Sequence, residues 1–136
     1  MFPKEHLYLL IRDGESRNRV GIALCEAAKD AALPAESAAL LALAACFRPD
    51  ERKEAQAMLE NERPAHPATG YHAVCWAVAV AAFLAADALH HGDGKPALDE
   101  LRRAETTALY SARAAWLYDL MREARRRFEA PPPEAE

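Results

Sequence analysis

Cysteine is scarce in this sequence, and its placement argues against the usual cysteine-based sites. The 136 residues include three cysteines, Cys25, Cys46 and Cys75, each surrounded by aliphatic residues. An odd number without a Cys-x-x-Cys pair fits neither a disulfide framework nor a zinc site. We therefore expect three buried thiols that act as small hydrophobic residues in a reducing compartment, and we expect a cytoplasmic location.

Common catalytic and cofactor-binding motifs are also missing. The sequence contains no glycine-rich phosphate loop, no Gly-x-Ser-x-Gly, no His-Glu-x-x-His and no zinc-ligand spacing. It also lacks the Glu-x-x-His pair with which helical bundles bind two iron ions. These absences favour a protein without catalytic activity, and we expect no cofactor.

Positive charge is not in excess. The formal net charge is −4 and the isoelectric point is near 5.7, whereas domains that bind the phosphate backbone are usually basic. We therefore expect no nucleic acid partner. The apolar patch near the N-terminus is too short for the hydrophobic region of a signal peptide and has charges on both sides, which again favours the cytoplasm.

Aromatic residues make up only 7% of a chain that is 51% hydrophobic, because alanine dominates the apolar share. Alanine, leucine, glutamate and arginine favour helices, and no run of alternating β-branched residues predicts a strand. The length suits one domain. We predict an all-α fold, a compact bundle of five or six helices, with a single helical domain over residues 1–130 and a loose proline-rich tail over 131–136.

The longest apolar stretch, Tyr71–Leu89, predicts a central helix over about residues 70–91. A helix that is apolar on all sides must be enclosed by other helices or by lipid. Four alanines recur at every fourth position and predict a ridge for close helix packing: Ala73, Ala77, Ala81 and Ala85. His72 and Asp87 lie inside the run, so we expect enclosure by protein and consider membrane association unlikely.

Prolines and N-capping residues divide the rest of the chain into shorter helices. These helices are predicted to begin at or near Pro3, Ser16, Pro34, Pro49 and Pro96, and Thr69 is predicted to cap the central helix. The last segment extends to Phe128. It forms either one helix or two helices with a break near Thr106-Thr107, where β-branched residues weaken it.

Three residues near the end of the central helix offer an alternative function. Asp87 and His91 are four residues apart, so their side chains meet on a helix, and His90 lies in the same turn. A carboxylate and imidazoles can share a metal ion or a proton, which would make the protein a small metal-binding bundle or enzyme. We favour an ordinary ion pair, because metal-binding bundles draw ligands from several helices.

His72 and Cys75 form a second candidate pair, three residues apart at the start of the same helix. A histidine that contacts a thiol can generate a nucleophile. The surrounding apolar run, however, raises the pKa of a thiol rather than lowering it. We therefore favour a packed core thiol.

Aromatic and basic residues of the types enriched at protein interfaces gather in the last predicted segment. They are Tyr110, Trp116, Tyr118, Arg122, Arg125 and Arg126. Arginines near the end of a helix also suit its dipole. We predict a helical protein-interaction module, such as an adaptor, an immunity-type protein or a self-associating protein, whose partner is another protein or a second copy of the chain.

Overall fold

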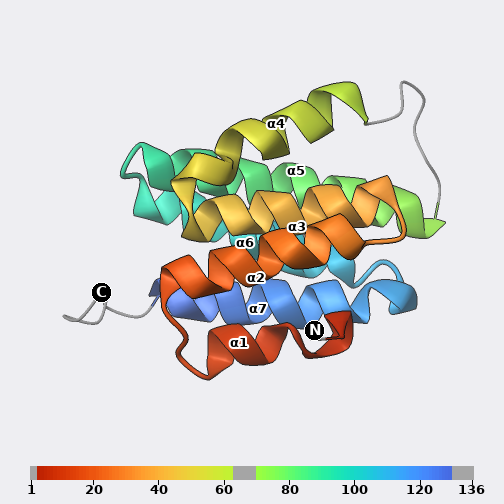
Figure 1. Ribbon diagram of the computed structural model, residues 1–136, viewed down its shortest axis with the longest axis horizontal. Helices are drawn as coiled ribbons and strands as arrows, with labels where there is room; N and C mark the ends of the chain where they lie inside the picture. The colour runs from red at the N-terminus through yellow and green to blue at the C-terminus, as the bar shows by residue number, and fades with distance from the viewer. Residues whose placement is uncertain (1–2, 63–69, 130–136) are drawn as a thin grey trace.

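The computed structural model describes residues 3–62 and 70–129, and every regular element within these ranges is a helix (Figure 1). The predicted compact all-α bundle is confirmed. The α-helices are α1 Tyr8–Arg12, α2 Arg17–Asp30, α3 Pro34–Phe47, α4 Arg52–Asn61, α5 Gly70–His90, α6 Gly94–Ala108 and α7 Ala115–Glu129, and the 3₁₀ helices are η1 Lys4–His6, η2 Pro49–Glu51 and η3 Ala112–Ala114. The predicted cap Thr69 and the tail over 131–136 lie outside the described residues.

The helix starts follow local signals in the sequence. Ser16 caps α2, and its Oγ accepts a hydrogen bond from the backbone N–H of Arg19 at 3.3 Å. Pro34 is the first residue of α3, where its missing N–H costs no helical hydrogen bond. Pro49 opens η2, which leads directly into α4. These three starts agree with the prediction.

The last segment forms two helices rather than one. The break between them lies a few residues C-terminal to the predicted position. Thr106 stays within α6 because its hydroxyl donates to the backbone carbonyls of the preceding turn, at 2.9 Å to Arg102 and 3.2 Å to Arg103. The chain leaves the helix only after Ala108 and is extended at Ser111. This break yields α6 and α7, so the described residues contain seven α-helices instead of five or six.

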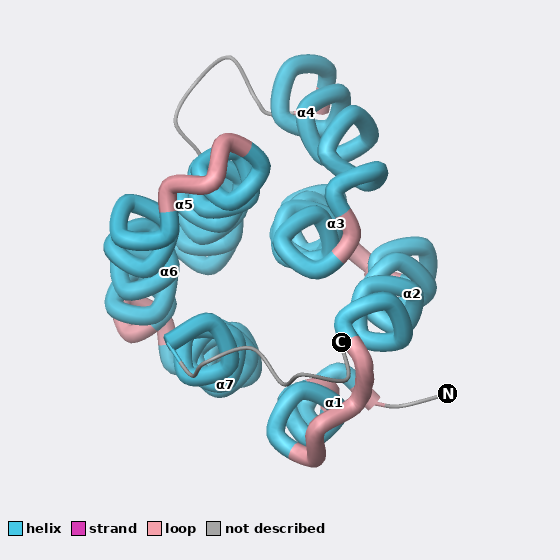
Figure 2. The backbone as a smooth tube through the Cα atoms, turned by 90° about the vertical axis from the view of Figure 1, so that its left-hand side faces the viewer, coloured by secondary structure: helices cyan, strands magenta, loops and turns pink. Residues whose placement is uncertain are grey.

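The helices surround a common interior. Figure 2, which looks along them, shows α2, α3, α5, α6 and α7 in a ring that α1 completes, with α4 outside against α3. Large side chains from these elements fill the interior and are almost completely buried: Ile11, Leu24, Leu43, Val78, Leu101, Leu117, Leu120 and Met121. Helices α3, α5 and α7 all begin at the same end of the bundle (Figure 1).

Helix α3, not α5, is the most completely enclosed helix. Twelve of the 14 residues of α3 are buried, because it packs against α2, α4 and α5. Helix α5 was expected to be enclosed on every side, but only ten of its 21 residues are buried. Among the described residues, α5 is the one helix long and apolar enough to cross a membrane, and 50% of its most apolar window is buried in the bundle.

The predicted alanine row does not form one packed face. Ala81 and Ala85 are buried, Ala73 is half-buried and Ala77 is exposed. A step of four residues exceeds a full helical turn by about 40°. The row therefore winds around α5 from solvent into the interior.

Small side chains nevertheless bring α3 and α5 close together. The Cys46 thiol of α3 lies 3.5 Å from the backbone carbonyl oxygen of Ala82 on α5, within reach of a hydrogen bond. Ala82 and Ala42, whose backbone carbonyl oxygen lies 3.7 Å from the same thiol, both have no exposed surface. Because Ala82 is completely buried, a side chain larger than a methyl group there would displace packed atoms.

We predict that Ala82→Leu lowers the free energy of unfolding by about 1–3 kcal/mol, because the added carbons overpack the α3–α5 contact. The matched control is Ala57→Leu at an exposed position of α4, which should change stability by less than about 0.5 kcal/mol. Urea unfolding followed by circular dichroism measures both. Equal effects of the two substitutions would contradict the close packing.

Candidate functional site

The candidate site is built around Glu36, a carboxylate that is only 3% exposed. Its Oε2 accepts a hydrogen bond from the Tyr71 hydroxyl at 2.5 Å and another from the Lys4 ammonium at 3.1 Å. The indole N–H of Trp116 donates to the Tyr71 hydroxyl oxygen at 2.9 Å. One hydrogen-bonded chain thus connects α7, α5 and α3 inside the bundle.

These residues come together because the three helices that carry them begin at the same end of the bundle. Glu36 lies in the first turn of α3, Tyr71 in the first turn of α5 and Trp116 in the first turn of α7. The N-terminus of a helix carries a partial positive charge that stabilises a nearby carboxylate. The backbone of Leu33, which precedes α3, also hydrogen-bonds the Glu36 carboxylate.

Two cations flank the aromatic members of the network. The Lys4 ammonium nitrogen lies 5.1 Å from the centre of the Trp116 ring, and the Arg113 guanidinium carbon lies 4.2 Å from the centre of the Tyr71 ring. Both distances are within the range of a cation–π interaction. Lys4 therefore contacts the network twice, through the Glu36 carboxylate and through the indole face.

The protonation states follow from burial and hydrogen bonding. Burial raises the pKa of the Glu36 carboxyl, but hydrogen bonds from Tyr71 and Lys4 outweigh it, so the pKa lies below its ordinary value. Burial, reinforced by the carboxylate of Glu36, raises the pKa of the Tyr71 hydroxyl. Glu36 is therefore ionised and Tyr71 neutral at pH 7.

A pocket of about 270 Å³ opens beside Lys4 and Glu36. Its walls come from the N-terminal segment, from α2 and the residues after it, from α3 and from α7, and most of the lining atoms are apolar. The lining residues are Pro3, Lys4, Ala27, Asp30, Ala31, Ala32, Glu36, Leu40 and Trp116. A buried carboxylate, an indole and a small pocket thus meet at one place.

The predicted pair His72 and Cys75 does not form a catalytic arrangement. Cys75 has no exposed surface, and burial raises its pKa to about 11. His72 is exposed. Burial likewise raises the pKa of Cys25 to about 11 and that of Cys46 to about 12. All three thiols are therefore protonated at pH 7 and are poor nucleophiles.

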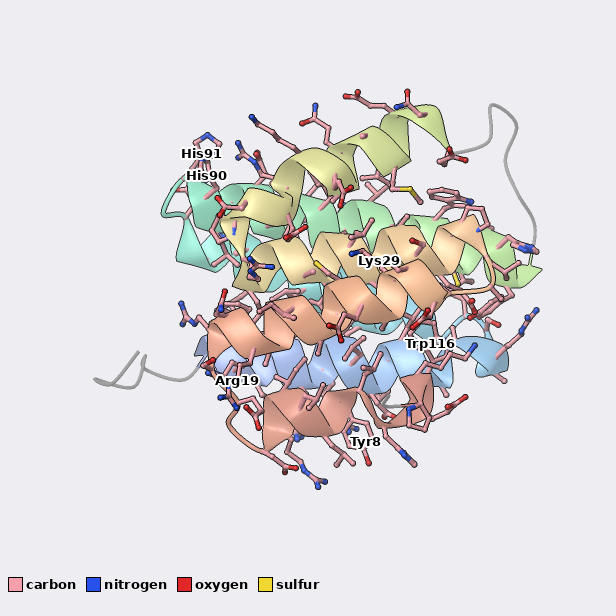
Figure 3. The ribbon with its side chains drawn as sticks, viewed as in Figure 1. Tyr8, Arg19, Lys29, His90, His91 and Trp116 are labelled. Atoms are coloured by element: carbon pink, nitrogen blue, oxygen red, sulfur yellow. The ribbon has the colours of Figure 1, made fainter. Side chains whose placement is uncertain are left out.

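The Asp87, His90 and His91 cluster is engaged in other contacts. Asp87 Oδ1 accepts a hydrogen bond from Arg52 of α4 at 3.0 Å, and His91 Nδ1 lies 2.8 Å from the backbone oxygen of Asp87. The two histidines are at the end of the bundle opposite Trp116 (Figure 3). Within residues 3–62 and 70–129, no three His, Cys, Asp or Glu side chains are grouped to hold a metal ion.

The structure separates the six aromatic and basic residues predicted to bind a partner. Tyr110 is 85% exposed between α6 and α7, whereas Trp116 is buried. Tyr118 is half-buried, with the Arg122 guanidinium 5.4 Å from its ring centre. The remaining two arginines bind buried carboxylates, Arg125 to Glu105 and Arg126 to Glu123. These two arginines neutralise carboxylates of α6 and α7 instead of forming a basic patch.

The sequence interpretation did not single out Glu36 as a site residue. One signal was available: Glu36 belongs to PAESAALLALAACF, in which no other charged residue occurs. A carboxylate in a helix destined for burial requires hydrogen-bond donors. The identity of those donors, Tyr71 and Lys4, depends on long-range packing that the sequence pattern does not encode.

Comparisons with protein families, with curated proteins and with solved structures find no match to this chain.

We predict that Tyr71→Phe lowers the free energy of unfolding by about 1–3 kcal/mol, because the Trp116 N–H loses its acceptor and Glu36 loses a donor in the core. Tyr110→Phe is the matched control, since Tyr110 is 85% exposed. Chemical unfolding measures both variants. A Tyr71→Phe protein as stable as wild type would show that the network contributes no stability.

We also predict that Glu36 contributes to acid sensitivity. Its pKa is lower in the folded than in the unfolded protein, so its contribution to stability is present above the unfolded value of about 4.5 and is lost as the pH falls through the folded value. Stability measured between pH 7 and pH 3 should therefore fall less steeply for Glu36→Gln than for wild type. Glu26→Gln, at an exposed position, controls for the change in net charge, and parallel slopes for wild type and Glu36→Gln would refute the prediction.

Proposed function

We propose that this chain is a helical protein-interaction module without catalytic activity, and that it pairs with a second copy of itself through the outer face of α5. The observation that carries the proposal is an apolar row on this helix that the rest of the chain covers only in part, since two of its four residues are exposed and two are half-buried. We call it the α5 stripe, and it consists of Ala73, Ala77, Val80 and Leu84. Leu84 is 43% exposed and is one of four exposed large hydrophobic residues within the described ranges 3–62 and 70–129.

The spacing of the α5 stripe is that of a helix-packing seam. Its residues are separated by steps of four, three and four, the pattern with which coiled-coil helices contact each other. The stripe faces away from α3, whose contact with α5 is made by other residues such as Ala82. A partly uncovered apolar seam supports the proposed contact with another molecule.

Residue sizes along the stripe fit an antiparallel second copy. In an antiparallel pair with two-fold symmetry, Leu84 of one copy faces Ala73 of the other, and Val80 faces Ala77. A large side chain then meets a small one in every layer. In a parallel pair, the two Leu84 side chains face each other and the alanines leave a gap, so the antiparallel arrangement packs better.

The ends of the stripe also suit this arrangement. Asp87 follows the stripe on the same face of α5 and would lie near Gly70, the first residue of α5, in the second copy. The positive end of a helix dipole stabilises a carboxylate there. The stripe spans only about three helical turns, so the flanks of α4 and α6 must supply the rest of a stable interface.

The metal-binding or enzymatic alternative has no comparable support. Asp87 is bound by Arg52, at 3.0 Å, and the thiol groups are protonated at pH 7. The exposed pair Leu109 and Tyr110 is a second apolar surface on the chain. It is small and lies at the corner between α6 and α7, so we assign the main contact to the α5 stripe.

Size-exclusion chromatography with light scattering tests the proposal. We expect a dimer, with twice the 15.0 kDa mass of one chain, at high micromolar concentration. Leu84→Glu should give a folded monomer, because it places a charge against the apolar side chains of the second copy. Leu109→Glu is the matched control at another exposed leucine and should stay dimeric. A monomeric wild-type protein would overturn the proposal.

Disulfide trapping tests the antiparallel register. An equimolar mixture of Ala73→Cys and Leu84→Cys proteins should form a mixed disulfide dimer on mild oxidation, because these positions face each other across the pair. A parallel pair would instead link each variant to itself. Flotation with vesicles of phosphatidylcholine and phosphatidylglycerol tests whether the α5 stripe binds a membrane instead. Wild-type protein that floats with the vesicles but stays monomeric would contradict the proposed dimer.

A further inference from the structure

We propose that the pocket beside Glu36 binds small primary amines, whose ammonium group replaces that of Lys4 between the Glu36 carboxylate and the Trp116 ring. This inference concerns the opposite side of the bundle from the α5 stripe. It does not depend on the proposed self-association.

Lys4 itself indicates the kind of ligand the pocket recognises. Its ammonium nitrogen is 3.1 Å from Glu36 Oε2 and 5.1 Å from the centre of the Trp116 ring. A carboxylate and an aromatic face are the two groups with which proteins recognise ammonium. Because Glu36 Oε2 accepts an N–H hydrogen bond, the geometry favours a primary amine over a quaternary one.

The acceptor side of the pocket is fixed without Lys4. Tyr71 donates to Glu36 at 2.5 Å, and the Trp116 indole is held by its own hydrogen bond to Tyr71. The Glu36 side chain is 4% exposed, whereas that of Lys4 is 41% exposed. The carboxylate and the indole therefore form a preorganised wall, and the cation approaches from the solvent side.

Lys4 is held weakly by comparison. It belongs to η1, a 3₁₀ helix of three residues, none of which is buried. Segments with few buried contacts open at low free-energy cost. An external amine can therefore compete with Lys4 without unfolding the bundle.

The size and charge of the pocket limit the ligand. Its volume of about 270 Å³ is below the usual range of pockets for drug-sized ligands, so an amine with a short aliphatic chain or one aromatic ring fits. The apolar body would contact Ala27, Ala31 and Leu40. The titratable lining groups are Lys4, Asp30 and Glu36, so displacement of Lys4 leaves two carboxylates and favours a cation.

Nuclear magnetic resonance with ¹⁵N-labelled protein tests the proposal, since the chain has two tryptophans and thus two indole N–H signals. Titration with n-butylamine or phenethylamine should shift the Trp116 signal in a saturable way and leave that of Trp76 unchanged, because Trp76 does not line the pocket. The Trp76→Phe variant assigns the two signals. The neutral analogue n-butanol should cause no saturable shift.

Lys4→Met should bind the amine about tenfold more tightly than wild type, as expected if Lys4 occupies the site about nine-tenths of the time. Lys29→Met, at an exposed position of α2 outside the pocket (Figure 3), is the matched control and should bind as wild type does. A folded Lys4→Met protein with no saturable shift would overturn the proposal. Equal binding of n-butanol and n-butylamine would also overturn it, because Glu36 would then play no part.

Discussion

The enclosure of α3 is the constraint on which the rest of the structure depends. Twelve of its 14 residues are buried, so helices must cover it on nearly every side. Within the buried part of α3, Glu36 is the one charged side chain. A buried carboxylate costs several kcal/mol unless donors compensate it. Tyr71 from α5 and Lys4 from η1 provide those donors, so the buried Tyr71 fixes the first turn of α5 against α3, and the more exposed Lys4 adds a cation from the solvent side.

The same constraint explains why α5 is left partly uncovered. Helix α4 packs mainly on α3, and α6 covers only one side of α5. The outer face of α5 therefore keeps Ala77 and Leu84 in solvent although the helix is apolar. Exposed apolar surface is unfavourable in water, and the proposed second copy would cover it at the cost of lost translational, rotational and side-chain freedom. The proposed dimer thus follows from a helix arrangement that covers α3 and leaves the outer face of α5 partly exposed.

Much of the fold was predictable because its signals are local. Ser16, Pro34 and Pro49 mark helix starts through capping and through the fixed geometry of proline, and in the structure one helix follows Ser16 and two others begin at Pro34 and Pro49. The prediction that α5 is the most enclosed helix was wrong, because α3 has that place. Both helices are apolar, and only the packing of the whole chain decides which of them has neighbours on every side. The hydrogen-bonded network around Glu36 was not predictable, because its other members, Tyr71, Trp116 and Lys4, are distant in sequence.

The two proposed binding surfaces lie on different sides of the bundle, but Tyr71 connects them. Its hydroxyl binds Glu36 at the amine pocket, and its backbone is two residues before Ala73 of the α5 stripe. Coupling between sites requires an element with two arrangements that both ligands favour differently. Tyr71 is buried, and its hydroxyl donates a hydrogen bond to Glu36 and accepts one from Trp116, which leaves the side chain one arrangement. Replacement of Lys4 by an external ammonium would preserve the charge beside Glu36, so we expect Tyr71 and the α5 stripe to stay in place and the two proposed surfaces to act independently.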